Sequence, residues 1–169
     1  MAIIFRNAVE TDVPEIIDLC NESFNENTSV EYAMQAFEQS KNNPCDIYIV
    51  GVNEENGEIV SHVKVTIVTT MFEGMGNFGL CNHVCVKPTY RGQKICASMI
   101  DYVRMVCAAR YCGSIRLWSS NFREAAHRSY INNGFEPQDV TVFFSDLESK
   151  IKVREDSPAN PKSLGLKKK

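Results

Sequence analysis

The spacing of apolar residues along the chain changes several times, and each change predicts a new helix or strand. Residues 3–5 predict a short strand. Thr11-Asp12 followed by Pro14 predicts the start of a helix, because these residue types favour the first turn. A second helix is predicted from Thr28 and Glu31, which have the spacing of a capping box.

Alternating apolar and polar residues follow in the middle of the chain. Residues 47–52 and 59–72 flank the turn pair Asn56-Gly57 and predict a hairpin. Residues 80–86 predict a further strand, which leads into a polar loop. Three strands in succession therefore follow the two helices.

Helical and strand-like patterns alternate in the last part of the folded region. Residues 94–111 carry an apolar stripe at helical spacing, and residues 114–119 read as a short strand. Residues 121–133 predict a helix that ends at Gly134, and residues 140–144 alternate as a last strand. The predicted order of elements is β-α-α-β-β-β-α-β-α-β, with no internal repeat.

The composition fits one globular domain, with 169 residues of which 44% are apolar and 23% charged. A net charge of −3 gives no basis for binding to nucleic acid or to a membrane surface. No apolar stretch approaches the roughly 18 to 20 residues that span a bilayer, and the N-terminus lacks the layout of a signal peptide. We therefore expect a soluble, cytoplasmic protein.

Cysteine usage and charge distribution add two expectations. The seven cysteines include no C-x-x-C pair, so we expect mostly reduced core residues and no metal site. Residues 148–169 hold seven basic and three acidic residues and few large apolar groups. We expect a domain at residues 1–147 and a basic, poorly packed tail at residues 148–169.

The segment from Val84 to Cys96, VCVKPTYRGQKIC, passes from a strand through a polar loop into the start of a helix. The first N–H groups of a helix lack intrahelical partners and carry the positive end of its dipole, so they stabilise an anion. Arg91 and Lys94 stand beside them. The pattern indicates a phosphate site, although an ordinary capped surface helix has the same local features.

This segment resembles the acetyl-CoA-binding motif of the GNAT superfamily of N-acetyltransferases. The family pattern after a V-x-V-x-P strand end is Arg or Gln, two residues, Gly, one residue, then Gly or Ala. The sequence departs from it at Lys94, where a second glycine is usual, and at Cys96, where the family has Gly or Ala. The matching residues are Val84, Val86, Pro88, Tyr90, Arg91, Gly92 and Ile95.

A second stretch resembles the family's A-x-x-F-Y-x-x-x-G-F helix. It begins at Ala125-Ala126 and includes Tyr130, and Gly134-Phe135 follow at the family's spacing. The family's Asn near the start of this helix falls on Arg123, and its Phe falls on Ser129. The two motifs together extend the resemblance over residues 3–147.

The resemblance implies an α+β fold in which about four helices flank a mixed, mostly antiparallel sheet of six to seven strands. The fourth and fifth strands splay apart, and acetyl-CoA lies in the gap as co-substrate, without a metal. Its pantetheine arm pairs with a strand edge and its pyrophosphate lies at the helix start. The implied cofactor-binding residues are Val84, Cys85, Val86, Arg91, Gly92, Gln93, Lys94, Ile95, Cys96, Asn121 and Arg123.

The implied chemistry is direct attack of a primary amine on the thioester in a ternary complex. A main-chain N–H near Cys85 polarises the carbonyl, and Tyr130 stabilises the leaving thiolate by hydrogen bonding. Many relatives have a carboxylate as base where this sequence has Asn82-His83. His83 is expected to take the proton directly, or Asn82 to hold a water that does so, and a merely packed or surface histidine is the alternative.

A cysteine nucleophile is a second mechanism, because strand alternation places Cys81, His83 and Cys85 on one face. The run from Ala125 to Tyr130 most resembles small-amine and aminoalkylphosphonate acetyltransferases. We therefore predict an acyltransferase acting on a small-molecule amine. The alternatives are a protein or peptide N-acetyltransferase and a non-catalytic acyl-CoA-binding regulator. The last predicted strand could pair across a homodimer.

Overall fold

The computed structural model describes residues 2–144, and the chain divides into two units, Met1–Glu136 and Pro137–Lys169. The predicted tail at residues 148–169 lies outside the described residues. Residues 137–144 form neither helix nor strand, so the strand predicted at residues 140–144 is wrong. Its alternating apolar side chains are 65–91% exposed, and no strand pairs with this segment among the residues described.

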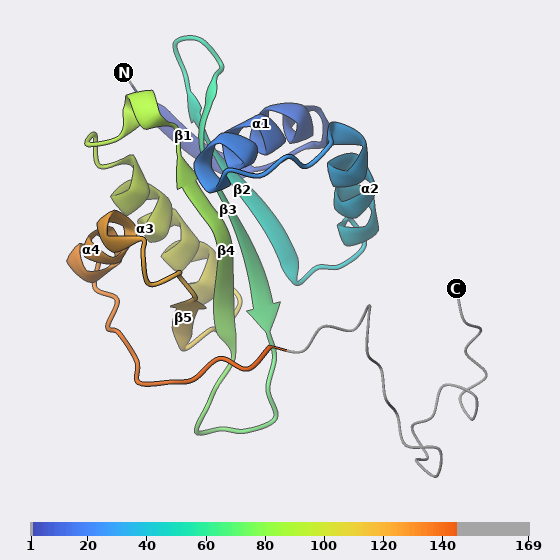
Figure 1. Cartoon of the computed structure of the whole chain (residues 1–169). Coiled ribbons are helices and arrows are strands. Elements are labelled where there is room, and N and C mark those ends of the chain that lie inside the picture. Colours follow the sequence, from blue (N-terminus) through green and yellow to red (C-terminus); the bar gives the residue numbers. More distant parts are fainter. Residues whose placement is uncertain (1, 145–169) are drawn as a thin grey trace. The chain divides into compact units, whose positions relative to one another are not determined.

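The first unit is built on one open, mixed sheet with the strand order β1-β2-β3-β4-β5 (Figure 1). The first four strands are antiparallel neighbours, and β5 runs parallel to β4. Five strands between residues 2 and 144 replace the six to seven predicted, because residues 140–144 supply none. The strands are β1 (Ile3–Asn7), β2 (Asp46–Asn53), β3 (Ile59–Val68), β4 (Phe78–Val86) and β5 (Ser114–Leu117).

Four α-helices cover the two faces of this sheet, as predicted (Figure 1). α1 and α2 lie on one face, where Phe37 of α2 packs on Tyr48 of β2, while α3 and α4 lie on the other. The helices are α1 (Val13–Phe24), α2 (Val30–Ser40), α3 (Ile95–Ala108) and α4 (Glu124–Asn132), with short 3₁₀ turns at Glu10–Asp12 and Pro88–Tyr90.

Several predicted boundaries shift by a few residues. The residue that caps α2 is Ser29 rather than Thr28, because the Ser29 hydroxyl accepts a hydrogen bond from the Tyr32 N–H at 3.2 Å. The Thr28 N–H instead donates to the Asn21 side-chain oxygen at 2.9 Å. β3 ends at Val68, and Met71 in the following loop is almost fully exposed.

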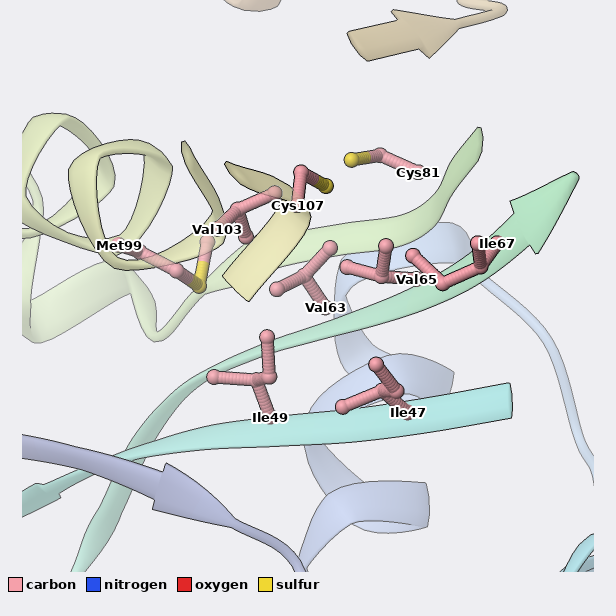
Figure 2. Close-up of a cluster of buried hydrophobic side chains, with 9 residues drawn as sticks. All are labelled: Ile47, Ile49, Val63, Val65, Ile67, Cys81, Met99, Val103 and Cys107. Carbon is pink, nitrogen blue, oxygen red and sulfur yellow. The ribbon is translucent and has the colours of Figure 1, made fainter. Parts of the chain in front are cut away.

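The core on the α3 face contains nine buried side chains (Figure 2). Each large aliphatic residue buried there contributes roughly 1.5–3 kcal/mol. α3 comes so close to β4 that a Cβ at Gly79 would lie 2.4 Å from the Cys107 sulfur, so this contact requires glycine. The nine residues are Ile47, Ile49, Val63, Val65, Ile67, Cys81, Met99, Val103 and Cys107.

β4 contains a bulge that changes which way its side chains point. His62 of β3 pairs with Cys85 and Lys64 pairs with Asn82, so three steps along β4 match two along β3. The extra residue is accommodated at His83, whose φ is +53°. Cys81 therefore packs in the α3-side core, whereas Cys85 packs in the α1-side core. The prediction that Cys81, His83 and Cys85 share one face is wrong, because the bulge reverses the alternation.

Candidate active site

The edge of β4 becomes free halfway along the strand. Pairing between β4 and β5 runs from Phe78 with Ser114 to Cys81 with Leu117, and there it stops. β4 continues to Val86 with only β3 beside it. Main-chain groups of residues 82–86 thus border a gap, where an extended amide chain can pair as an added strand would. The predicted pantetheine residues Val84, Cys85 and Val86 lie along this edge.

The loop after β4 ends in a left-handed turn. Gly92 has φ of +79° and Lys94, the N-cap of α3, has φ of +62°. The left-handed region costs a non-glycine residue roughly 1–2 kcal/mol, which explains why the motif has glycine at the position of Lys94. The first main-chain hydrogen bond of α3 runs from the Ser98 N–H to the Lys94 carbonyl. The N–H groups of residues 95–97 therefore lack an intrahelical acceptor and can bind an anion.

Cationic side chains stand beside these N–H groups. The Arg91 Nε donates to the Val86 carbonyl at 3.1 Å, which ties the arginine to the end of β4 and leaves its guanidinium exposed. Lys94 and Gln93 are exposed as well, and the Gln93 amide donates to the Thr89 carbonyl at 3.4 Å. An open, cationic helix start of this kind suits a diphosphate group.

A polar network ties the loop after β4 to the β2–β3 hairpin. The Tyr90 hydroxyl donates to Glu58 at 2.6 Å and accepts from the buried Asn53 amide at 3.1 Å. Lys87 forms an ion pair with Glu58 and, together with Tyr90, lowers the pKa of that carboxyl group. Sequence reasoning matched Tyr90 to the motif but missed Asn53 and Glu58, because no local pattern links the β2–β3 hairpin to the loop.

Two of the four residues that depart from the family motifs contact each other. The Ser129 hydroxyl of α4 lies 3.4 Å from the Cys96 sulfur in the first turn of α3. Cys96 is larger than the usual Gly or Ala, and Ser129 is smaller than the usual Phe. The larger residue at position 96 therefore replaces a small part of the volume lost at position 129, where α4 packs on α3.

Tyr130 lies on α4 against the open end of β4. It borders a cavity of about 10 Å³, which β4 lines with Cys81 and Val84 and β5 with Leu117. Burial, followed by the nearby Cys96 and Cys81, raises the pKa of Tyr130 to about 12. The phenol therefore keeps its proton at neutral pH and can donate a hydrogen bond.

His83 is exposed at the bulge, with its ring centroid 6.1 Å from that of Phe24 in α1. Partial burial and the charge of Lys64 lower the pKa of His83 below its ordinary 6.5, so its ring is neutral at pH 7. Asn82 is half-buried beside it. His62 differs, because it is fully buried with its Nδ1 2.9 Å from the Ile49 carbonyl, and burial lowers its pKa to about 4.

The cysteines of β4 do not form a nucleophilic pair with His83. Burial raises the pKa of Cys81 to about 12, and the pKa of Cys85 is raised by its contact with Cys20 and by burial. The sulfur atoms of Cys20 and Cys85 lie 3.9 Å apart. Both β4 thiols are therefore protonated at neutral pH, and the bulge sends them to opposite faces.

Phe24, the last residue of α1, is another residue of the site that sequence reasoning missed. The Arg123 guanidinium lies 4.8 Å from the centre of the Phe24 ring and 5.6 Å from that of Phe122. Phe24 lies four residues after Cys20, a helical spacing typical of a core position, so no local pattern marks it as a site residue. Arg123 is half-buried just before α4, whereas Asn121 is exposed in the loop before it.

A larger cavity, of about 270 Å³, lies at the other end of α3 and contains none of the predicted site residues. It is lined by Arg104, Cys107, Gly134 and Phe135 among others. Between residues 2 and 144, no three His, Cys, Asp or Glu side chains cluster as metal ligands. In the same part of the chain no helix has the length and hydropathy needed to cross a membrane.

Comparison with known proteins identifies the family of this arrangement. A family model described as an acetyltransferase (GNAT) domain matches residues 5–137. No curated protein sequence matches the chain.

Solved structures of low sequence identity share the fold. Glucosamine-6-phosphate N-acetyltransferase from Arabidopsis thaliana has a TM-score of 0.73 at 17% identity, covering 86% of this chain and 99% of that one. An aminoglycoside 6'-N-acetyltransferase from Acinetobacter baumannii has a TM-score of 0.73 at 12% identity, covering 86% and 98%. An acetyltransferase from Clostridium acetobutylicum, described with acetyl-CoA, has a TM-score of 0.67 at 18% identity, covering 85% and 96%.

Proposed function

The chain belongs to the GNAT family of acetyltransferases, and we propose that it moves the acetyl group of acetyl-CoA to a primary amine of a small molecule. The observation that carries this proposal is the free edge of β4. Pairing with β5 stops at Cys81, and beyond Val86 a short loop with the 3₁₀ turn Pro88–Tyr90 leads to the left-handed start of α3. One continuous stretch of backbone thus offers an amide edge followed by an anion site.

The proposed cofactor contacts divide by chemistry. Main-chain groups of Val84, Cys85 and Val86 pair with the pantetheine amides, and N–H groups of residues 92–96 bind the pyrophosphate. Arg91 and Lys94 add positive charge at the helix start. Gln93 and Asn121 complete the proposed cofactor contacts; the resemblance implies Arg123 as well, but its guanidinium stacks on Phe24 of α1.

The proposed reaction is direct attack of the neutral amine on the thioester carbonyl. A main-chain N–H near Cys85 stabilises the charge that develops on the carbonyl oxygen. Before the attack His83, which is neutral at pH 7, removes one proton from the ammonium form of the acceptor, either directly or through a water held by Asn82. The second N–H proton becomes acidic once the nitrogen has attacked, and it passes to the leaving thiolate. The resulting bond joins the amine nitrogen to the acetyl carbon, and the carbon–sulfur bond breaks to release the thiolate.

Tyr130 is the proposed donor to the leaving thiolate. With its pKa near 12 and a thiol pKa of about 8.5, full proton transfer from the phenol is uphill by about 5 kcal/mol. Tyr130 therefore acts by donating a hydrogen bond, and the net proton comes from the amine. Small amines, including aminoalkylphosphonates, remain the proposed acceptors because the run from Ala125 to Tyr130 resembles enzymes of that group.

The test has two stages on the full chain. Calorimetric titration with acetyl-CoA is expected to show saturable binding at one site. Release of free thiol is then measured over a panel of small amines and peptides, and acceleration by a small amine is the expected result. Binding without thiol release from any amine indicates an acyl-CoA-binding protein, release with peptides alone indicates a peptide acetyltransferase, and failure to bind acetyl-CoA overturns the proposal.

A further inference from the structure

Arg123 is a partly buried cation without a carboxylate partner among residues 2–144. Three other partly buried cations of the fold each have one: Arg6 pairs with Asp12, Lys64 with Asp46 and Lys87 with Glu58. Removing a cation from water without a counter-ion costs free energy. The structure instead holds Arg123 against the rings of Phe24 and Phe122. Stacking of this kind leaves the guanidinium edge, with its N–H donors, available for a ligand.

Arg123 lies near both His83 and Tyr130, the two residues proposed to act on protons in the reaction. Phe24 contacts its guanidinium at 4.8 Å and the His83 ring at 6.1 Å, both measured between group centres. The positive charge of Arg123 also acts on Tyr130, where it partly offsets the rise in the phenol pKa. Arg123 therefore lies next to the place where the amine and the thioester meet.

Phe24, the ring on which Arg123 stacks, is held in place by hydrogen bonds within the protein. Asn21 holds the loop after α1 with two hydrogen bonds to Thr28, one donated to its carbonyl and one accepted from its N–H, both at 2.9 Å. Phe24 is the last residue of α1 and lies between these anchor points. A guanidinium stacked on a fixed ring loses little freedom on binding, which favours a specific contact.

We propose that Arg123 binds an oxyanion, of the carboxylate or phosphate type, on the acceptor itself. The acceptor class is then a primary amine with an anionic group a short chain away from its nitrogen. This inference rests on the proposed acetyl transfer and adds the part of the substrate that sets specificity. It also moves Arg123 from the cofactor contacts implied by its place in the motif to the acceptor side of the site.

The experiment measures kcat/KM for matched amines with saturating acetyl-CoA. β-Alanine, 2-aminoethyl phosphate and 2-aminoethylphosphonate carry the oxyanion. β-Alaninamide and ethanolamine are the matched amines in which an uncharged group replaces it, and they are called uncharged amines below. The full chain is expected to prefer an oxyanion amine by about tenfold or more, and the ranking distinguishes carboxylate from phosphate groups. Arg123→Gln is expected to raise KM for the preferred amine at least tenfold, leaving uncharged amines and the Kd for acetyl-CoA within about twofold. Arg123→Lys should recover part of the loss.

Arg116→Gln is the matched control. Arg116 also stacks on a phenylalanine, with its guanidinium 4.0 Å from the Phe78 ring, but at the paired end of β4 and β5. The Arg116→Gln variant should leave the preference for amines with an oxyanion unchanged. Equal use of the amines with and without an oxyanion overturns this inference alone, and so does use of neither by a chain that acetylates another small amine. A clearly higher Kd for acetyl-CoA in Arg123→Gln would show that Arg123 binds the cofactor, and this result also overturns the inference. If acetyl-CoA does not bind the unaltered chain, the proposed function and this inference fall together.

Discussion

The proposed cofactor side and the proposed acceptor side of the site are built in opposite ways. The cofactor side is one continuous segment, residues 84–96, and it relies mainly on backbone N–H groups and a strand edge. The acceptor side brings together side chains from three separate elements, namely Phe24 of α1, His83 of β4 and Arg123 before α4. A backbone site tolerates altered side chains at Lys94 and Cys96, whereas a side-chain site depends on each identity.

The largest effect is expected where the two sides meet, at Tyr130. Tyr130→Phe removes the hydroxyl that donates to the leaving thiolate but keeps the ring and its packing on Phe135. We expect kcat to fall by about 100-fold while the Kd for acetyl-CoA changes by less than about twofold. Thiol release and calorimetry measure the two quantities separately.

Tyr102→Phe is the control for this loss of a hydroxyl. Tyr102 lies on α3 with its ring against Phe5, away from the open end of β4. It should leave kcat unchanged. A Tyr130→Phe variant with unaltered kcat would show that Tyr130 only packs in the structure and has no role in the reaction.

His83 tests the acceptor side through pH. A base works only when it is deprotonated, and the pKa of His83 is lowered by partial burial and by Lys64. Activity should therefore be lost as pH falls through a value on the acid side of 6.5, and be retained above it. His83→Asn keeps a residue that accepts the positive φ at the bulge.

We expect this variant to lower kcat/KM at pH 7.5 by about tenfold, less than a full general-base effect because Asn82 can still hold a water. The acid limb of the pH profile should disappear at the same time. Persistence of the same limb in His83→Asn would assign it to another group and remove His83 from the acceptor side.

Arg91 tests the cofactor side with a smaller effect. Arg91→Ala removes an exposed charge and its bond to the Val86 carbonyl, so the Kd for acetyl-CoA should rise about fivefold with kcat unchanged. Arg91→Lys keeps the charge but loses the hydrogen bond from Nε. Its Kd for acetyl-CoA, measured by calorimetry, should lie between those of the unaltered chain and Arg91→Ala. Equal affinity of all three proteins would contradict the phosphate assignment of Arg91.

The same contrast explains how much of the molecule could be predicted from sequence. The helices, the hairpin at Asn56-Gly57 and the helix start at residues 94–96 follow from local patterns of apolar, turn and cap residues. The number of strands did not follow, because residues 140–144 alternate correctly but pair with no strand in the described part of the chain. Alternation predicts a strand only where a neighbour supplies its hydrogen bonds.

The acceptor side depends on features that no short pattern encodes. The bulge at His83 puts Cys81 and Cys85 on opposite faces, and the sequence L-C-N-H-V-C at residues 80–85 gives no sign of it. Phe24 and Arg123 meet only because α1 and the start of α4 pack around the same strand end. The motif therefore names the residues of the proposed backbone site, whereas the contact between Phe24 and Arg123 in the proposed side-chain site has no signal in the sequence.

Lys94 gives the smallest and most specific test of a site built from backbone. Its φ of +62° is strained for any residue with a Cβ, so Lys94→Ala loses the charge and keeps the strain, whereas Lys94→Gly loses both. Both variants should weaken acetyl-CoA binding equally, by about twofold, because both retain the main-chain N–H groups. The glycine variant should be more stable than the alanine variant by up to about 1 kcal/mol in denaturant unfolding. Equal stability would mean that residue 94 does not hold the left-handed turn, and unequal affinity would mean that the side chain, not the backbone, forms this half of the site.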